Sequence, residues 1–498
     1  MATVSSLGIG SGLDLNSLLA GLKTAEQLPL AAIQQQQKSY TSKLSAYGQL
    51  NSALEELQKA AAALAQPALY QGVTATPTAP DVLTATALSS AQTGTYAVDV
   101  KQLSQAQSLA AAGVASTTAV VGGGTVTIQF GKISGGTLDA ASGTYSGASF
   151  AADTSRAATA ITIDASHNTL AGIRDVINGN ADSGVTASIV NDGTATPNRL
   201  VLTSTQTGET SSMKITVSGD AALSNLLAND PAGLPAAQKM QQTAVAQNTK
   251  LTVNGIAITS ATNMVKDAVQ GVTMTLAKVG LSTLSVQSDT ATVDTAVSTF
   301  MTAYNKLQGT AAKLSAFDAT SKTGATLLGD ATLRNIQVRV RAALTAVQAP
   351  DSSSGLTTLS QIGISLQTDG TLGFDPKNDK TMSGAEKLKD ALDNKMSGVQ
   401  QLFSGTSGPS GVGGYGRQMS ALLTGLTDSN GTLTSATKGI NRSLESLATQ
   451  YTATSERIDV TIARYKAQFT KLDVMMSNMN QTSSYLMQQF DALNNSNK

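Results

Sequence analysis

The strongest hydrophobic pattern of the chain lies near its C-terminal end. No glycine or proline follows Ile440, so one helix of roughly 80 Å is expected there. A seven-residue repeat keeps one narrow apolar stripe on a helix, which predicts packing against another helix. The apolar residues follow each other in steps of four and three, with Ser483 taking one position: Ile458, Ile462, Tyr465, Phe469, Leu472, Met476, Met479, Leu486, Phe490 and Leu493.

The N-terminal part predicts helices with apolar faces of the same kind. A short helix is expected first, capped at its start by Asp14 or Asn16 and interrupted by Pro29. Its apolar face contains Leu13, Leu15, Leu18 and Leu22. A longer near-heptad helix follows and ends at Pro67; its apolar positions are Tyr40, Leu44, Tyr47, Leu50, Leu54, Leu57, Ala61 and Leu64.

The middle of the chain changes to short β-like runs separated by turn residues. One helix, Leu170 to Asn178, interrupts them. Residues 221–243 are expected to form a linker with some helical tendency. The predicted strands cover residues 82–86, 96–100, 126–130, 160–163, 185–189, 200–203, 214–217, 251–253, 256–258, 272–276 and 284–286.

Helical periodicity returns after this β-rich part. Helices are expected around residues 293–304, 327–344, 386–403 and 417–426. Between the second and third of these, Ile362–Leu366 and Leu372–Phe374 predict a hairpin, with Asp369 and Gly370 as a type I′ turn.

The order of helix, β-rich insertion and helix predicts an α+β multidomain fold in which the two ends of the chain meet. The fold has helical coiled-coil termini, a helix-plus-hairpin stem and two β-rich inserted domains. The expected parts are a terminal coiled-coil leg (1–42 and 456–498), a helical stem with the hairpin (43–70 and 290–455), a β-rich domain (71–118 and 241–289) and an inserted β-rich tip domain (119–240).

Composition excludes several classes of partner. Charged residues make up 13% of the 498 residues and balance to a net charge of zero, so no nucleic-acid footprint is expected. No apolar run predicts membrane insertion or the core of a cleaved signal peptide. Cysteine is absent, which excludes disulfides and thiolate metal sites.

Candidate chemistry is sparse. The only histidine, His167, lies in a polar turn and is interpreted as a solvated loop residue. Asp428 to Gly431 resembles the start of a calcium loop, but its glycine comes too early, so it is interpreted as a turn that ends a helix. We expect no cofactor, no metal and no enzymatic activity; an unusual carboxylate pair is the remaining enzymatic alternative.

Three blocks of sequence resemble a known family. They are Ser5 to Leu19 near the start, Arg464 to Asp473 with Met479 to Leu486 near the end, and Leu359 to Ile364 with Asp369 to Leu372 between them. Together they resemble the flagellar filament cap proteins, the hook-associated protein 2 family.

The resemblance implies a structural protein that forms a ring, a pentamer or hexamer, at the distal tip of the bacterial flagellum. Flagellin would fold and insert beneath the ring, as filament elongation and motility require. Further implied partners are the hook-associated junction proteins and, at the C-terminus, a type III export chaperone. The implied location is extracellular, reached through the flagellar type III apparatus. The apolar positions of the two terminal helices, Leu13 to Leu22 and Ile458 to Leu493, are then the expected sites of self-association or of filament or chaperone contact.

Several alternatives stay open from the sequence. The C-terminal seam could serve only an intramolecular coiled coil. The chain could be another hook–filament junction protein, or a tip-exposed adhesin that binds host mucin through residues 119–240. If the leg orders only on assembly, residues 1–42 and 456–498 should be protease-sensitive in the free protein.

Overall fold

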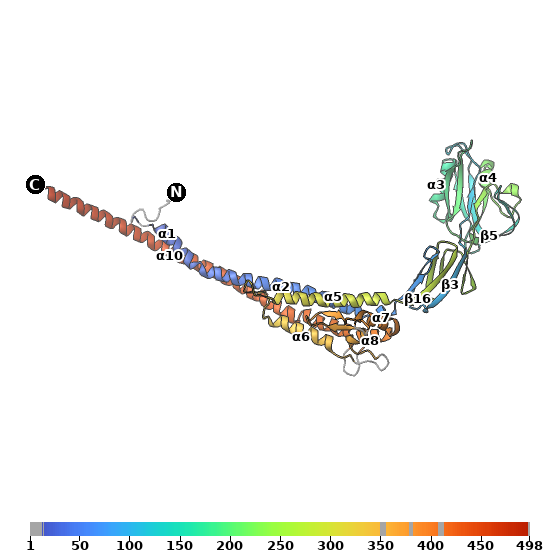
Figure 1. The fold of residues 1–498 in the computed structure, drawn as a ribbon. Helices are drawn as coiled ribbons and strands as arrows, with labels where there is room; N and C mark the ends of the chain where they lie inside the picture. The colour runs from blue at the N-terminus through green and yellow to red at the C-terminus, as the bar shows by residue number, and fades with distance from the viewer. Residues whose placement is uncertain (1–11, 13, 349–354, 378–381, 407–412, 497–498) are drawn as a thin grey trace. The chain divides into compact units, whose positions relative to one another are not determined.

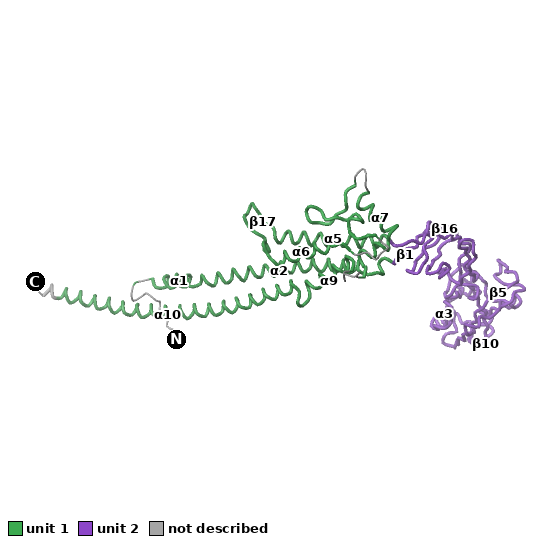
Figure 2. The backbone as a smooth tube through the Cα atoms, turned by 90° about the horizontal axis from the view of Figure 1, so that it is seen from below, with its two compact units in different colours: residues 1–70, 290–498 green, residues 71–289 purple. Residues whose placement is uncertain are grey.

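The computed structural model describes residues 12, 14–348, 355–377, 382–406 and 413–496 (Figure 1). The chain divides into two compact units, residues 1–70 with 290–498 and residues 71–289 (Figure 2). The first unit contains long helices from both ends of the chain, and the second contains most of the strands. The predicted α+β multidomain fold class, with a β-rich insertion between helical ends, is therefore confirmed.

The helices of the first unit begin where the sequence supplies caps. Asp14 caps α1, Asp330 caps α6, and Ser383 with Glu386 forms a capping box at α7. Pro29 lies in the first turn of α2, where its missing N–H breaks no helical bond. The elements are α1 (Leu15–Glu26), α2 (Leu28–Leu64), η1 (Pro67–Gln71), α5 (Thr290–Ser315), β17 (Phe317–Asp318), β18 (Thr323–Gly324), α6 (Ala331–Thr345), η5 (Leu359–Ile362), β19 (Ile364–Leu366), β20 (Leu372–Phe374), α7 (Gly384–Asn394), α8 (Met396–Ser404), α9 (Tyr415–Thr427) and α10 (Thr432–Ser496).

The core of this unit forms around α2. The predicted near-heptad positions of α2 from Tyr47 to Leu64 are buried, and α5, α9 and α10 pack against this helix. Buried tyrosines keep their hydroxyl groups satisfied: Tyr304 donates to Gly370 O at 3.1 Å, and Tyr47 donates to Asp330 Oδ2 at 2.8 Å. The α2 seam thus holds the helical bundle together.

The turn between β19 and β20 differs from the prediction. Leu366 pairs with Leu372, so five residues form the loop rather than two. Gly370 has φ 83°, but Asp369 does not have a positive φ, whereas a type I′ turn needs both. Gly370 N instead donates to Gln367 O, and the Asp369 carboxylate accepts from Thr371 N. The predicted type I′ turn was wrong because the Asp369 side chain binds the backbone two residues ahead of it.

The predicted helical segment 386–403 also differs, because it consists of two helices. Lys395 leaves the helical conformation at φ −138° and ψ 35°, between α7 and α8. No glycine or proline marks this break. Helix packing, rather than local chemistry, therefore determines where the chain bends.

The second unit contains two β-rich cores. In the first, a five-stranded sheet β1-β16-β3-β12-β13 and a three-stranded sheet β14-β15-β2 share one hydrophobic cluster. The predicted strands at 82–86 and 96–100 both exist, but they belong to these two different sheets. The elements are β1 (Val73–Pro77), β2 (Leu83–Ala87), β3 (Gly94–Gln102), β12 (Thr249–Val253), β13 (Ile256–Ser260), β14 (Met264–Val269), β15 (Val272–Leu276) and β16 (Gly280–Ser288).

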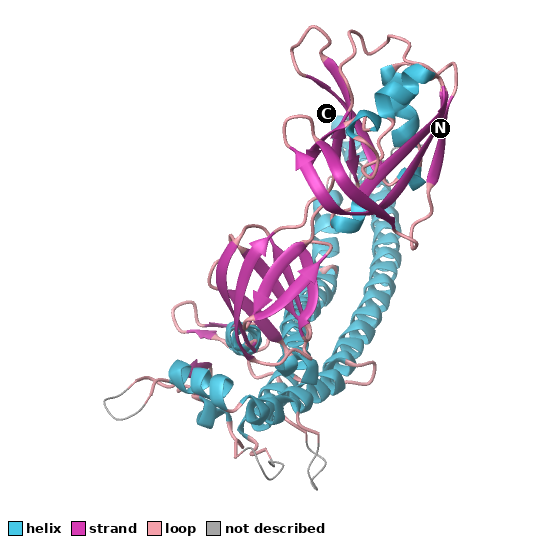
Figure 3. Ribbon diagram, turned by 90° about the vertical axis from the view of Figure 1, so that its right-hand side faces the viewer, coloured by secondary structure: helices cyan, strands magenta, loops and turns pink. Residues whose placement is uncertain are grey.

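The second core lies between two four-stranded sheets and two helices. One sheet has the order β10-β5-β6 with β7 also on β5, and the other has the order β11-β4-β9-β8. Helix α3 packs against β8 and β7, and α4 packs against β10. Figure 3 shows helices in cyan beside the magenta strands of the sheets. The elements are β4 (Ser108–Ala110), β5 (Gly124–Asp139), β6 (Thr144–Ala152), β7 (Thr159–Ile163), α3 (Leu170–Gly179), η2 (Ala181–Ser183), β8 (Val185–Asn191), β9 (Asn198–Ser204), η3 (Glu209–Ser211), β10 (Ser212–Gly219), α4 (Ala221–Leu227), η4 (Pro235–Ala237) and β11 (Gln241–Ala244).

The four-part domain division stays a prediction. The strands β4 and β11 lie just outside the predicted 119–240 segment, yet they pair in the sheet of β8 and β9. Their sequences, Ser108 to Ala110 and Gln241 to Ala244, are too short and too polar to signal strands.

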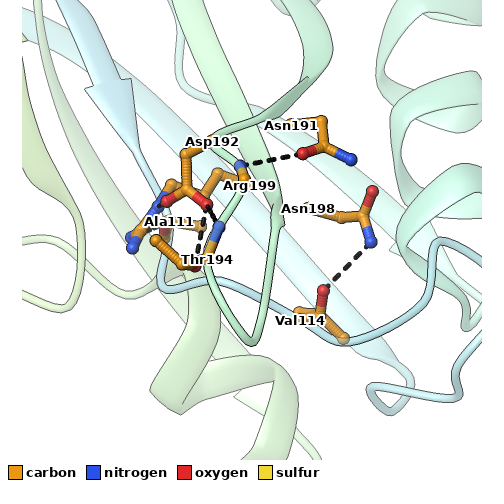
Figure 4. Close-up of polar contacts among 8 residues, drawn as sticks. Ala111, Val114, Asn191, Asp192, Thr194, Asn198 and Arg199 are labelled. Carbon is orange, nitrogen blue, oxygen red and sulfur yellow. Dashed lines mark hydrogen bonds and ion pairs between the residues drawn. The ribbon is translucent and has the colours of Figure 1, made fainter.

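The turn between β8 and β9 is held by a compact polar cluster (Figure 4). Asp192 accepts hydrogen bonds from Thr194 N at 3.0 Å and from Arg199 Nε. The Arg199 guanidinium, together with the Thr194 bonds, lowers the pKa of Asp192 to about 2. The Asn198 side chain donates to Val114 O, which ties this turn to the segment that follows β4.

Candidate assembly surface on the terminal helices

The N-terminal helices lie along α10 in the first unit (Figure 1). Of the two predicted caps, Asp14 is the one used: its Oδ1 accepts from Ser17 N at 3.0 Å. Leu15 is buried beside α10, whereas Leu18 is 51% exposed and Leu22 is half-buried. Leu13 lies outside the described residues. Gln34 of α2 donates to the Tyr451 hydroxyl of α10 at 3.3 Å and adds a polar contact to the apolar seam.

The apolar seam of α10 begins earlier than the sequence pattern indicated. Leu433, Ile440 and Leu447 are buried at intervals of seven residues, before the first predicted position, Ile458, which is 3% exposed. The seven-residue interval keeps these side chains on the side of the helix that meets α2. This earlier half was missed because Thr, Ser and Gly residues between its members weaken the pattern.

Coverage of the seam declines towards the C-terminal end of α10. The next predicted positions, Ile462, Tyr465, Phe469 and Met476, are half-buried, and Leu472 is 39% exposed between them. Past this point the seam is bare: Met479 is 57%, Leu486 50% and Phe490 65% exposed. Leu493 lies in the same helix, but its side chain is outside the described residues.

The bare end of α10 is apolar on more than its seam. Val474, Met475, Tyr485 and Met487 lie off the seam and are all more than half exposed. Contiguous exposed apolar surface of this kind is typical of interaction sites. The cluster of methionines adds flexible side chains that can fit partners of different shape. We call residues 474–490 of α10 the bare segment.

The exposed apolar side chains of the bare segment are suited to association with another molecule. Within the described ranges, no group of three or more acidic, His or Cys side chains could hold a metal ion. No helix in that part of the chain is long and apolar enough to cross a membrane. The interactions available at the bare segment are therefore hydrophobic packing and helix pairing.

His167 lies in a surface turn, as the sequence predicted. Its Nδ1 lies 2.9 Å from Asp164 Oδ1 and 2.9 Å from the Ser166 hydroxyl. Hydrogen bonds from Ser166 and His167 lower the pKa of Asp164 to about 2. Because both partners approach the same ring nitrogen, the cluster does not form a nucleophile relay, which needs serine and aspartate on opposite nitrogens. These residues stabilise a turn.

Comparison with solved structures shows which known fold this one resembles. The structure is similar to the D1–D2–D3 domains of the flagellar cap protein FliD from Escherichia coli, with a TM-score of 0.58 and 33% identity over 80% of this chain and 99% of that chain. A long helical bundle carrying β-rich domains is thus the architecture of a flagellar cap protein.

The sequence comparisons identify the family. The protein-family model "Flagellar hook-associated protein 2 N-terminus" matches residues 11–107 of this chain. The family model "Flagellar hook-associated protein 2 C-terminus" matches residues 246–481. Flagellar hook-associated protein 2 of Escherichia coli strain K12 is 38% identical over 100% of both chains, and that of Salmonella typhimurium is 37% identical over 100% of both. The chain belongs to the flagellar hook-associated protein 2 family, and the expected resemblance is confirmed.

Proposed function

We propose that several copies of this chain form a ring that caps the distal end of a flagellar filament. Flagellin subunits that arrive at the tip fold and insert beneath this ring, so the filament elongates and the cell can swim. Membership of the hook-associated protein 2 family supports this function. The bare segment of α10 is the single structural observation that carries it, because it needs a partner that the described part of the chain does not supply.

The bare segment needs a partner that offers an apolar surface. Leaving apolar surface in water is unfavourable by about 25 cal/mol per Å². In the proposed cap this surface packs on helices of the filament interior, on flagellin or on hook-associated junction proteins. Before export through the flagellar type III apparatus, a chaperone that binds the same segment would keep it from aggregating. Residues 1–42 and 456–498 then act as the leg, and residues 119–240 form the tip.

A deletion strain complemented with variants tests this function. We expect the full chain to restore long filaments, with labelled protein at their distal ends in electron micrographs. A chain that ends at Asn478 keeps the covered part of the seam but lacks most of the bare segment, so we expect short filaments and unpolymerised flagellin in the medium. Label at the hook, or normal filaments without the protein, would rule out capping.

A further inference from the structure

A groove runs between α2 and α5 in the first unit, with a volume of about 660 Å³. Its floor contains the small side chains Ala60 and Ala303, which are nearly buried. Three threonines of α5 line its wall, namely Thr295, Thr299 and Thr302. Small residues on both helices leave room between them for side chains from another molecule.

The threonine wall presents methyl groups rather than hydroxyl groups. Each hydroxyl donates to the carbonyl four residues earlier: Thr295 to Ala291, Thr299 to Thr295 and Thr302 to Ser298, all at 2.8 Å. A threonine bonded in this way has its polar atom satisfied within its own helix. The wall of the groove therefore has an apolar surface although threonine is a polar residue.

Charged residues of both signs border this groove. Lys306 of α5 contacts Glu56 of α2 at 2.6 Å, and Lys59 and Asp294 also line the groove. An occupant is then expected to have an apolar tip with one acidic and one basic side chain beside it.

The same unit carries such a tip on the hairpin β17–β18, which projects at the C-terminal end of α5 (Figure 2). Phe317 is 59% exposed and Leu328 is 51% exposed. Gly324 pairs with Phe317, and a Cβ atom on Gly324 would lie 2.6 Å from Leu328 Cδ2, so Leu328 packs against Gly324. We call Phe317 and Leu328 the knob. Asp318 and Lys322 of the hairpin are exposed beside it.

The hairpin holds its shape by local bonds. The Asp318 carboxylate accepts from Thr320 N at 2.8 Å and from the Ser321 hydroxyl at 2.7 Å. Lys322 adopts φ 54°, the left-handed conformation that closes the turn. A preformed tip loses little conformational freedom when it binds.

The knob of a chain cannot reach the groove of that chain. The threonine wall of the groove lies on α5, Phe317 lies two residues past the end of that helix, and a helix rises 1.5 Å per residue. From Thr299 in the groove wall to Phe317 the separation along the helix axis is roughly 27 Å. The occupant must therefore come from another molecule.

We propose that the knob of one copy of this chain inserts into the groove of the next copy. The two surfaces differ, so the contact is head-to-tail, and such contacts close into a ring when the rotation between copies permits. This inference rests on the proposed function, because it names the contact that joins the copies of the cap. Asp318 and Lys322 then lie beside the Lys59, Lys306, Glu56 and Asp294 side chains of the neighbour.

Introduced cysteines test this contact, because the natural chain has none. Full-length protein with Phe317→Cys and Thr299→Cys is treated with a short bis-maleimide at a concentration where light scattering shows the ring. We expect a ladder of covalent trimers and larger species up to the closed ring. A mixture of the two single variants should stop at dimers. The matched control pairs Thr299→Cys with Leu234→Cys, which is exposed in the second unit, and should give no ladder.

Association strength gives a second measurement that does not depend on cross-linking. Phe317→Ser, or Thr299→Arg to fill the groove, should raise the protein concentration needed for ring formation about tenfold. Leu234→Ser and Thr345→Arg, an exposed threonine on α6 with the same kind of hydroxyl bond, should leave it unchanged. If the ring forms but shows neither the cross-linked ladder nor the shift in the concentration needed for its formation, the knob contact is overturned and the proposed ring stands. Single copies only, both in solution and on filament ends, overturn the proposed ring and this contact together.

Discussion

Asp192 and Arg199 hold the two strands of the β8–β9 hairpin together across its turn. The carboxylate also accepts from the backbone of Thr194, so one side chain satisfies both the turn and the ion pair. Because the Arg199 guanidinium and the Thr194 hydrogen bonds favour the ionised carboxylate in the folded state, they lower the pKa of Asp192 from 3.8 to about 2. Its contribution to stability is complete above the ordinary pKa and is lost as the pH falls through about 2.

Asp192→Asn should lower the melting temperature of the second unit at neutral pH, because the ion pair and the ionised acceptor are removed. The difference from wild type should shrink as the pH falls from 3.8 towards about 2. Circular dichroism melts over this pH range measure it. Arg199→Gln serves as the control, and the double variant should be no less stable than the worse single variant. A difference that stays constant with pH would refute the assignment.

Two pairs of adjacent residues show how far turn chemistry can be predicted. Asn254 and Gly255, between β12 and β13, both have positive φ, 49° and 82°, and form the two-residue connection of a type I′ hairpin. Asp369 and Gly370 have an equally suitable sequence but lie in a five-residue loop. The pair of residues indicates a turn in both places. The register of the flanking strands, which depends on packing, decides its type.

Helix α10 changes character along its length. Its first half packs into the bundle through Leu433, Ile440 and Leu447, its middle lies along α1 and α2, and its bare segment is exposed from residue 478 onwards. Local sequence makes all three parts helical, because no residue after Ile440 interrupts the backbone hydrogen bonds. The stability of each part therefore depends on its neighbours rather than on propensity.

Ile458→Ala should destabilise the middle of α10 by about 3 kcal/mol, because it removes a buried side chain and leaves a cavity. Val460→Ala is the matched control, since Val460 is 71% exposed on the same turn and should change stability by less than about 0.5 kcal/mol. Hydrogen exchange of the amides of residues 450–470 reports local opening. Equal effects of the two substitutions would show that α1 and α2 do not cover this part of the helix in solution.

Limited proteolysis should separate the parts of α10 in free protein. The first cuts are expected in the bare segment, where every described side chain from 478 to 492 is exposed. The half of α2 from Tyr47 to Leu64 should resist, because it lies in the core. Assembled filament ends provide the comparison, in which the bare segment should become protected. Equal resistance of both segments in free protein would argue against a partner-dependent leg.

The two compact units have separate hydrophobic cores. The first unit has one cluster around α2, and the second has two clusters between its sheets. The β-rich unit is inserted between residues 70 and 290, so the helical bundle must form from segments more than two hundred residues apart in sequence. Such a unit depends on long-range pairing of its two chain segments.

Leu202→Ala should lower the melting temperature of the second unit and leave that of the first unchanged. Leu202 is fully buried in the second unit, and its truncation should cost about 3 kcal/mol. Leu54→Ala, in the core of the first unit, should have the converse effect. Differential scanning calorimetry measures both. Transitions that shift together for either variant would mean that the two units unfold as one.

Much of the architecture follows from the sequence. The heptad positions of α2 and α10 specify which faces are buried, because only a 3.5-residue repeat keeps apolar side chains on one side. The caps at Asp14 and Ser383 and the proline at position 29 determine where helices begin. Strand alternation also locates most β-strands, since one face of each sheet must be apolar.

Tertiary structure decided what no local pattern contains. Sheet order, the membership of β4 and β11, and the break at Lys395 depend on contacts between segments that are distant in sequence. The end of seam coverage near Met479 depends on how far α1 reaches along α10, although the repeat itself continues. The apolar groove between α2 and α5 could not be predicted from the sequence either, because it depends on the packing of two helices that are distant in sequence. Its threonines are polar by composition, and only their helical hydrogen bonds make their exposed surface apolar.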